Sequence, residues 1–275
     1  MCIGTHTCLT DEPFTYMASI ASTNMSDVRN IMQRMSTTAI GQLVHRAVEE
    51  GKMPLLNALL FNGANVDAIG DCGRTPLCIA ARLGDSIFVD KLFAYHARVY
   101  ALDDTLRTPL HWATLFGHKT CVCTLLTHGA DTDVKDEDGC TALHLASDAA
   151  IMRILVGYNA SVSAIDNDQR TPLHWAAVCG NRPCVRFLLE HGANIHAKDV
   201  DGCTAIHLAT DSNHMQTFRL LMDWGADMFE PAGDGQNTRV RAGLGGHTNI
   251  VNFISTYGMP CGHPHNPALA KNVYN

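Results

Sequence analysis

The sequence predicts an all-α solenoid of stacked helix-turn-helix units with projecting hairpin loops, and two observations carry this prediction. Residues 107–116, RTPLHWATLF, return at 170–179 as RTPLHWAAVC, and DGCTALHLASD at 138–148 returns at 201–211 as DGCTAIHLATD, both 63 residues later. Aligning on the Thr of TPLH gives a finer period, with spacings of 33, 33, 33, 30, 33 and 33 residues. A unit this short cannot bury its apolar face alone, so neighbouring units must stack. The anchor positions are Gln42, Thr75, Thr108, Thr141, Thr171, Thr204 and Asn237.

Each unit carries the signals that start and stop two short helices. Gly139 and Gly202 supply the permissive backbone of a tight turn, and the Thr that follows can cap a helix. In three copies the next residue is Pro, at the first helical position, whose amide would be unpaired anyway. A Gly ends this helix, and a second helix follows, such as CVRFLLEHGA at 184–193.

The stretch TPLHxA at a 33-residue period, followed by LLxxGA, resembles the ankyrin repeat. The resemblance covers residues 40–258 as seven copies. Residues 1–39 are then a non-repeat segment, and 259–275 an irregular tail. SDVRNIMQRM at 26–35 predicts a capping helix, with Val28, Ile31, Met32 and Met35 along one face. The weaker first and last copies predict caps at both ends of the array.

The repeat anchored at Thr141 departs from the pattern. Its ASDAAIM lacks the Gly-His that closes the first helix in its neighbours, which locates a three-residue deletion. We expect a local kink or notch there; the alternative is a harmless deletion that a surface loop absorbs. Asn159 replaces the Gly that ends the second helix, and Asn tolerates the left-handed conformation best among the alternatives.

Composition narrows the class of protein. A formal charge of −7 and a pI near 6.1 argue against binding of nucleic acid, which relies on Lys and Arg. No apolar run reaches the roughly 18 residues of a membrane span, and the N-terminus does not read as a signal peptide. Eleven cysteines, an odd number, indicate free thiols in a reducing compartment. We expect a monomer that lies inside the cell, in the cytoplasm, with the nucleus as an alternative location.

Signals for catalysis or metal binding are weak. No GxxxxGK loop or GxSxG elbow occurs, and the sequence predicts neither an enzyme nor a cofactor. The five His of the TPLH position are expected to form hydrogen bonds between neighbouring units, as the resemblance implies. Cys140 and Cys203 lie beside hairpin tips, where we expect small, exposed turn residues. Two terminal clusters, Cys2/His6/Cys8 and Cys261/His263/His265, each offer fewer than the four ligands of a structural zinc site.

The resemblance implies a scaffold, either adaptor or inhibitor, that binds another protein through hairpin tips and the concave helix face. The alternatives are a subunit that targets an enzyme to its substrates and a metal- or redox-responsive protein. The predicted partner-binding residues are Arg74, Arg107, Trp112, Leu115, Phe116, Glu137, Asp138, Asp168, Arg170, Trp175, Val178, Cys179 and Asp201.

Arg107 with Trp112 and Arg170 with Trp175 recur two repeats apart, about 20 Å along one face. They predict a groove for an extended partner segment, with the arginines pairing its acidic groups, and charge reversal at both is expected to abolish binding with folding intact. The alternative is a duplicated two-repeat block whose tryptophans pack between helices. Acidic tips could select a basic segment instead, or form a solvated face. One Asp in each turn, at 103, 136, 166 and 199, is expected to bond its own backbone.

Overall fold

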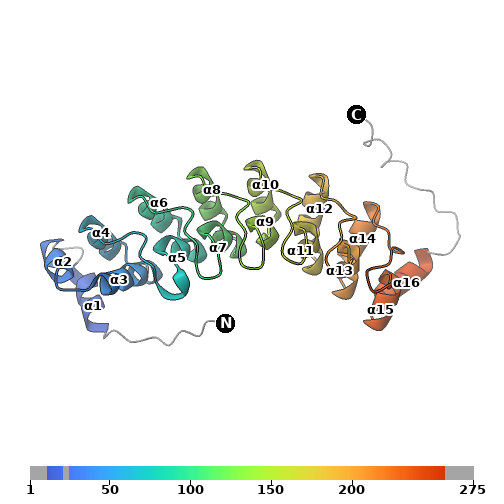
Figure 1. Cartoon of the computed structure of the whole chain (residues 1–275), viewed down its shortest axis with the longest axis horizontal. Coiled ribbons are helices and arrows are strands. Elements are labelled where there is room, and N and C mark those ends of the chain that lie inside the picture. Colours follow the sequence, from blue (N-terminus) through green and yellow to red (C-terminus); the bar gives the residue numbers. More distant parts are fainter. Residues whose placement is uncertain (1–10, 21–24, 258–275) are drawn as a thin grey trace.

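The computed structural model describes residues 11–20 and 25–257, and within them seven helix pairs follow one another along an arch (Figure 1). The second helices lie on the outer side of the arch, the first helices on its inner side (Figure 1). This arrangement confirms the predicted all-α solenoid. The first helices are α3 (Thr37–Glu49), α5 (Pro76–Leu83), α7 (Pro109–Leu115), α9 (Ala142–Leu145), α11 (Pro172–Val178), α13 (Ala205–Asp211) and α15 (Thr238–Leu244). The second helices are α4 (Met53–Phe61), α6 (Ser86–Ala94), α8 (Lys119–Thr127), α10 (Ala149–Gly157), α12 (Arg182–Glu190), α14 (Met215–Asp223) and α16 (Thr248–Tyr257).

The anchor residues cap the first helices, as the sequence predicts. Thr108 is the N-cap of α7, and its side chain accepts a hydrogen bond from the backbone N–H of His111. Asn237 caps α15 in the same way, through the N–H of Val240. The first pair differs, because α3 begins at Thr37 behind a Ser36 cap, so that Gln42 lies inside the helix.

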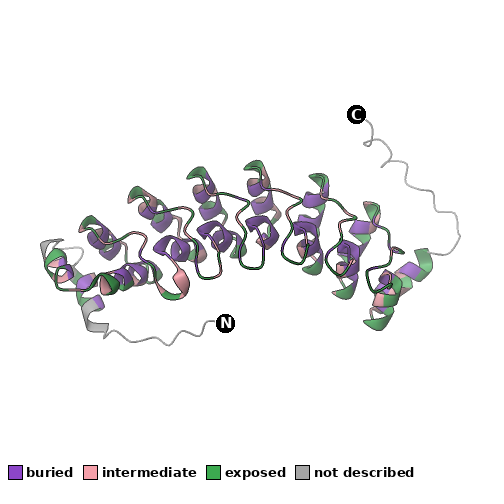
Figure 2. Ribbon diagram, viewed as in Figure 1, coloured by how far each residue is buried: buried purple, intermediate pink, exposed green. Residues whose placement is uncertain are grey.

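The core runs through the whole array as a stripe of repeated apolar positions (Figure 2). The Leu of TPL or TAL is fully buried in each of four successive repeats, and fully burying a Leu contributes roughly 1.5–3 kcal/mol. In the last described pair Arg239 takes this position and is exposed, as a polar outer face of a capping repeat would be. The four buried residues are Leu77, Leu110, Leu143 and Leu173.

Buried histidines tie each unit to the next. The backbone N–H of Thr108 donates to Nδ1 of His111 at 3.1 Å, which leaves Nε2 protonated to donate to the carbonyl of Cys140 at 3.2 Å. This neutral tautomer satisfies both ring nitrogens across a repeat boundary. The prediction of hydrogen bonds between units is therefore confirmed. The other partners are His45 with Ala68, His144 with Arg170, His174 with Cys203 and His207 with Glu230.

These five histidines should make the array less stable in mild acid. Burial lowers the pKa of each below its ordinary value of 6.5. The unfolded chain therefore binds protons that the folded chain excludes, so stability is full above about pH 6.5 and falls as pH drops below it. We expect a lower urea midpoint at pH 5.5 than at pH 7.5, and an equal or higher midpoint at pH 5.5 would contradict this linkage.

The deletion falls on the first helix of the Thr141 repeat. Helix α9 spans four residues, about half the length of α7 or α11, and the arch passes through it without a break (Figure 1). Asp148 caps the following helix through the N–H of Ala150, and Asn181 donates to the carbonyl of Ser147 at 2.6 Å. Asn159 adopts the left-handed conformation, with φ of 66°, as expected for a residue in place of Gly. The missing residues therefore shorten one helix.

Among the described residues, two helices precede the first pair. Helix α2 (Met25–Met32) lies within the segment predicted to form a capping helix and ends three residues before Met35; it buries Val28 and Met32, and Arg29 Nε donates to Asn62 Oδ1 at 3.0 Å. Helix α1 (Asp11–Ile20) was not predicted, because residues 1–24 show no apolar period. Among those of its side chains that the structure describes, Phe14 and Met17 are buried, and two positions are too few to register as a pattern.

Candidate protein-binding surface

Four hairpin tips, those before Thr108, Thr141, Thr171 and Thr204, are each held by a buried aspartate at the start of the turn. The carboxylate of Asp136 accepts from the backbone N–H of Asp138 at 3.1 Å and of Cys140 at 2.9 Å. Asp103, Asp166 and Asp199 bond the same two amides of their own turns. The prediction that these aspartates bond their own backbone is confirmed.

Successive tips are joined by backbone hydrogen bonds. The N–H of Glu137 donates to the carbonyl of Thr105 at 3.0 Å, and that of Asn167 donates to Asp138 at 3.0 Å. The same kind of bond links the neighbouring tips, so one continuous edge runs from the hairpin at residues 70–74 to the hairpin at residues 232–236. The remaining links are Asp104 to Cys72, Val200 to Asp168 and Gly233 to Asp201.

The arginines and tryptophans alternate in how they bind these aspartates. Arg107 reaches into the next hairpin, where its Nε lies 3.0 Å from Asp136 Oδ2, whereas Trp112 donates its indole N–H to Asp103 of its own hairpin at 2.8 Å. The pattern returns two repeats later with Arg170 and Asp199 at 3.5 Å and with Trp175 and Asp166 at 2.8 Å. The buried hairpin aspartates are thus bound alternately by a tryptophan and by an arginine, and this alternation underlies the 63-residue repeat in the sequence.

This geometry corrects one expectation. Arg107 is 22% exposed and its partner carboxylate is fully buried, so its guanidinium is part of the framework between two hairpins. We therefore expect that replacing Arg107 and Arg170 by Glu destabilises the fold, because each Glu would face a buried carboxylate. Trp112 is buried and Trp175 half-buried, which favours the packed, duplicated block for the first of them.

The predicted apolar positions lie at the ends of the first helices. Leu115 ends α7 and Val178 ends α11, with exposed fractions of 37% and 42%. Phe116 follows α7 and stacks between Trp112 and His118, with ring centroids 6.1 and 6.3 Å apart, while half of it stays exposed. Cys179, after α11, is exposed. These four side chains are accessible, and α9 lies between the two groups.

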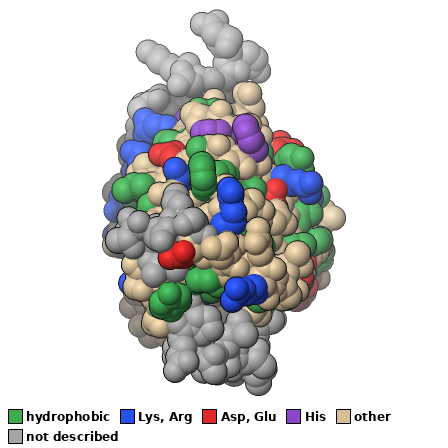
Figure 3. Space-filling view, turned by 90° about the vertical axis from the view of Figure 1, so that its left-hand side faces the viewer, with side chains coloured by type: hydrophobic (Ala, Val, Ile, Leu, Met, Phe, Trp, Pro, Cys, Tyr) green, Lys and Arg blue, Asp and Glu red, His purple; other side chains and the backbone are tan. Residues whose placement is uncertain are grey.

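Carboxylates line the tips between these positions. Seven of them are exposed, whereas Arg107 and Arg170, which pair with the buried turn aspartates, are only partly exposed. Viewed end-on from the side of α1 and α2, by contrast, the described surface mixes apolar, basic, acidic and histidine side chains (Figure 3). The exposed acidic residues of the tips are Asp71, Asp104, Glu137, Asp138, Asp168, Asp201 and Asp234.

The expected exposure of two turn cysteines is wrong. Cys140 and Cys203 are 1% and 3% exposed, because the N–H of each bonds the turn aspartate and draws the residue beneath the hairpin. Burial raises the pKa of the Cys140 thiol to about 12 and that of Cys203 to about 11. Neither thiol is activated as a nucleophile at neutral pH.

Leu106 is a site that sequence reasoning missed. It occupies a tip position that holds Gly139 and Gly202 in two other hairpins, and it adopts their left-handed conformation, with φ of 58°, while 46% exposed. A leucine pays roughly 1–2 kcal/mol in this conformation. Its alignment with the two glycines was the available signal.

Replacing Leu106 by Gly should therefore raise the free energy of unfolding, by up to about 1 kcal/mol. The matched control is Leu102→Gly in the same loop, where 48% of the side chain is exposed and φ is not positive. That change should lower stability by roughly 0.5–1 kcal/mol, since Gly adds entropy to the unfolded chain. Urea unfolding of both variants checks the prediction, and a loss of stability at both positions would refute it.

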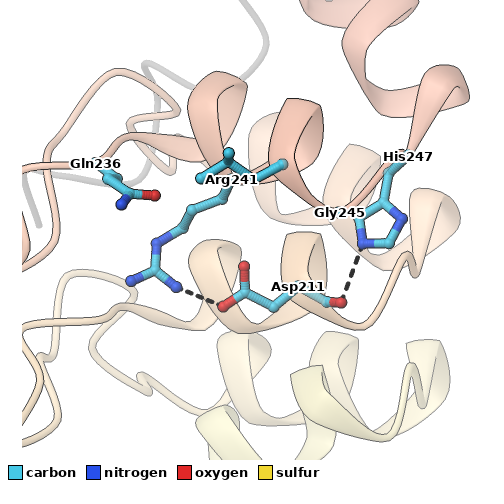
Figure 4. Close-up of a pocket in the computed structure, with 6 residues that line it drawn as sticks. Asp211, Gln236, Arg241, Gly245 and His247 are labelled. Atoms are coloured by element: carbon cyan, nitrogen blue, oxygen red, sulfur yellow. Dashed lines mark hydrogen bonds and ion pairs between the residues drawn. The ribbon is translucent and has the colours of Figure 1, made fainter.

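A pocket of about 240 Å³ at the C-terminal end of the array is lined by α13, α15 and the loops beside them (Figure 4). Its Arg241 pairs with Asp211 and with Asp234, so the protein's own carboxylates neutralise it. Another pocket, about 290 Å³, lies at Trp175 between two hairpins. Within the described ranges no three His, Cys, Asp or Glu side chains are grouped to hold a metal ion, and the clusters at Cys2 and Cys261 fall outside those ranges.

The fold and this surface define a helical repeat protein whose hairpins form one continuous edge. A family model described as "Ankyrin repeats (3 copies)" matches residues 44–136 and 127–199, and one described as "Ankyrin repeat" matches 201–231. The chain belongs to the ankyrin repeat family. Ankyrin repeats are generally protein-protein interaction modules and are typically non-catalytic. A comparison with the curated proteins finds no match. Over the described residues, every helix is too short or too polar to cross a membrane.

Proposed function

We propose that this chain is a non-catalytic scaffold that binds a partner protein along its hairpin edge and the exposed ends of its first helices. The observation that carries the proposal is the ladder of backbone hydrogen bonds that aligns the tips from residue 72 to residue 233. An edge held this way presents its side chains in a fixed order, which lowers the entropy lost when an extended segment binds. The array that does so spans the predicted residues 40–258.

The partner segment is basic in this proposal. The tips expose seven carboxylates, and the whole chain carries a formal charge of −7. A basic segment would be attracted over a distance of about 10 Å at 0.1 M salt, so binding should weaken as salt rises. The eight described cysteines carry free thiols, which supports a reducing compartment, cytoplasmic or nuclear, as the place of action. We propose a monomer as the binding form.

The test is affinity capture from the native cell extract with substitutions that leave the framework untouched. Leu115→Ser with Val178→Ser removes apolar contacts, and Glu137→Gln with Asp201→Asn removes charge from the tips. The matched control is Ile87→Ser with Glu190→Gln, on the exposed outer helices α6 and α12. Loss of a captured protein in both surface variants and its retention by the control supports the proposal. Equal capture by all forms overturns it.

The captured protein also separates the roles open to a scaffold. An adaptor leaves the activity of its partner unchanged, whereas an inhibitor reduces it in a purified mixture. Recovery of an enzyme together with its substrate would indicate a targeting subunit.

A further inference from the structure

One tryptophan of the array is covered by a cation of the protein itself. The guanidinium carbon of Arg74 lies 4.6 Å from the ring centroid of Trp112, and Arg74 Nε lies 3.8 Å from Asp103 Oδ2. Asp103 also accepts the indole N–H of Trp112 at 2.8 Å. The ring of Trp112, the carboxylate of Asp103 and the guanidinium of Arg74 thus contact one another between two successive hairpins, and we call these three side chains the closed group.

The same pair of a tryptophan ring and a carboxylate recurs two repeats later, at Trp175 and Asp166, without that cation. Trp175 donates its indole N–H to Asp166 at 2.8 Å, as Trp112 does to Asp103. Arg74 directly precedes the capping Thr75, and the residue directly before the capping Thr141 is Cys140. A buried cysteine cannot reach over the ring as an arginine does. The pocket of about 290 Å³ lies at this place, with Trp175 and Asp166 in its lining.

The charges around this pocket complement a cation. Its lining contains three carboxylates, from Asp138, Asp166 and Asp168, and one guanidinium, from Arg170. Arg170 is engaged with Asp168 at 3.4 Å and with Asp199 at 3.5 Å. At Trp112, by comparison, a second arginine stands at the matching place: Arg107 lies 5.4 Å from the ring, so the group accommodates two guanidiniums.

Arg107, a second guanidinium at the rim of the pocket, leaves the pocket with more carboxylates than guanidiniums. Arg107 Nη2 lies 4.0 Å from Asp138, whose side chain is 67% exposed, and the side chain of Asp168 is 58% exposed. Both rim carboxylates stand where the closed group has the uncharged Cys72 and Thr105. Asn167 of the pocket lining takes the place of Asp104, so the open pocket carries one carboxylate more than its closed counterpart.

We infer that the pocket at Trp175 receives an arginine side chain from the partner protein, in the place that Arg74 takes over Trp112. The inference rests on the proposed function and deepens it, because it names the residue that the scaffold recognises. A planar guanidinium can stack on the indole and bond carboxylates at the same time, which an ammonium group does less well.

The first test is an NMR titration of the whole chain with N-acetyl-arginine methylamide. The indole N–H signal of Trp175 should shift and saturate with a Kd of about 1 mM, whereas those of Trp112 and Trp224 should not move. The neutral isostere, N-acetyl-citrulline methylamide, should bind at least about 10-fold more weakly. An unmoved Trp175 signal, or equal shifts with citrulline, would overturn the inference.

The second test fills the pocket from within. Cys140→Arg places a guanidinium as Arg74 does, so the titration should no longer shift Trp175 in the folded variant; a full shift there would overturn the inference. If this variant fails to fold, Trp175→Leu and Trp112→Leu form a matched pair, because Leu145 and Leu208 occupy the same position in other repeats. Arginine should then shift the Asp168 amide in the Trp112 variant and not in the Trp175 variant; an equal shift in both would count against the pocket.

Capture from the cell extract separates this inference from the proposed function. A partner that binds the wild type and is lost from folded Cys140→Arg supports both. A partner held equally by the two forms leaves the scaffold standing and overturns its recognition of arginine through Trp175. If the wild type captures nothing, the scaffold proposal fails, and the titration alone decides whether the pocket binds a guanidinium.

Discussion

Arg107→Glu is expected to lower the free energy of unfolding by about 3–5 kcal/mol. The new carboxylate would face Asp136, which lies 3.0 Å from the present guanidinium and whose side chain is fully buried. Asp136 cannot turn away, because its other oxygen accepts two amides of its own hairpin. Urea unfolding followed by circular dichroism measures the loss.

The control for this change is an exposed ion pair of the same type. Arg98 lies 3.5 Å from Asp67 with 68% of its side chain exposed, so solvent screens the pair and Arg98→Glu should cost less than about 1 kcal/mol. If Arg107→Glu and Arg98→Glu lower the free energy of unfolding by the same small amount, Arg107 is not part of the framework between the hairpins. It would then be available to a partner, as the groove hypothesis requires.

Asp103→Ala is expected to cost about 3 kcal/mol or more. Its carboxylate accepts from Thr105 N–H, Thr105 Oγ1, Arg107 N–H and Trp112 Nε1, all between 2.7 and 2.9 Å. Alanine leaves these donors without an acceptor, and a buried donor left unpaired costs roughly 1–3 kcal/mol. The measurement is thermal or urea unfolding, with the indole N–H signal of Trp112 as the local reporter.

The adjacent Asp104 provides the matched control, because its side chain is exposed. Asp104→Ala should change stability by no more than about 0.5 kcal/mol and leave the Trp112 signal in place. Similar losses at both positions would mean that general charge, and not the buried hydrogen bonds of Asp103, stabilises the hairpin.

Local patterns were sufficient for the repeat unit because its interactions join residues close in sequence. Thr108 and His111 are three residues apart, and Asp136 bonds amides two and four residues ahead. The 30-residue spacing likewise pointed to the repeat in which α9 is short. Helix α1 was not predicted because its sequence shows no apolar period; of its described side chains, Phe14 and Met17 are buried.

The candidate site was less accessible to the same reasoning. The pattern places Arg107, Arg170, Cys140 and Cys203 beside hairpin tips, and it predicts arginines that are available to a partner and cysteines that are exposed. In the structure the next hairpin supplies the partner of Arg107, 29 residues along the chain. The partner-binding set itself, from Arg74 to Asp201, stays a prediction until binding is measured.

The order of residues alone was enough to predict the period, the helix pairs and their caps, whereas the histidine links between units were implied by the resemblance to ankyrin repeats. These features can be predicted because each copy of the repeat encodes them again in residues only a few positions apart. Stacking settled the rest: which arginines neutralise neighbouring aspartates, which thiols are buried, and why Trp112 is covered while Trp175 lines a pocket. These outcomes depend on two hairpins meeting at contact distance, so identical residues at one position take different roles according to the residue that the preceding repeat supplies.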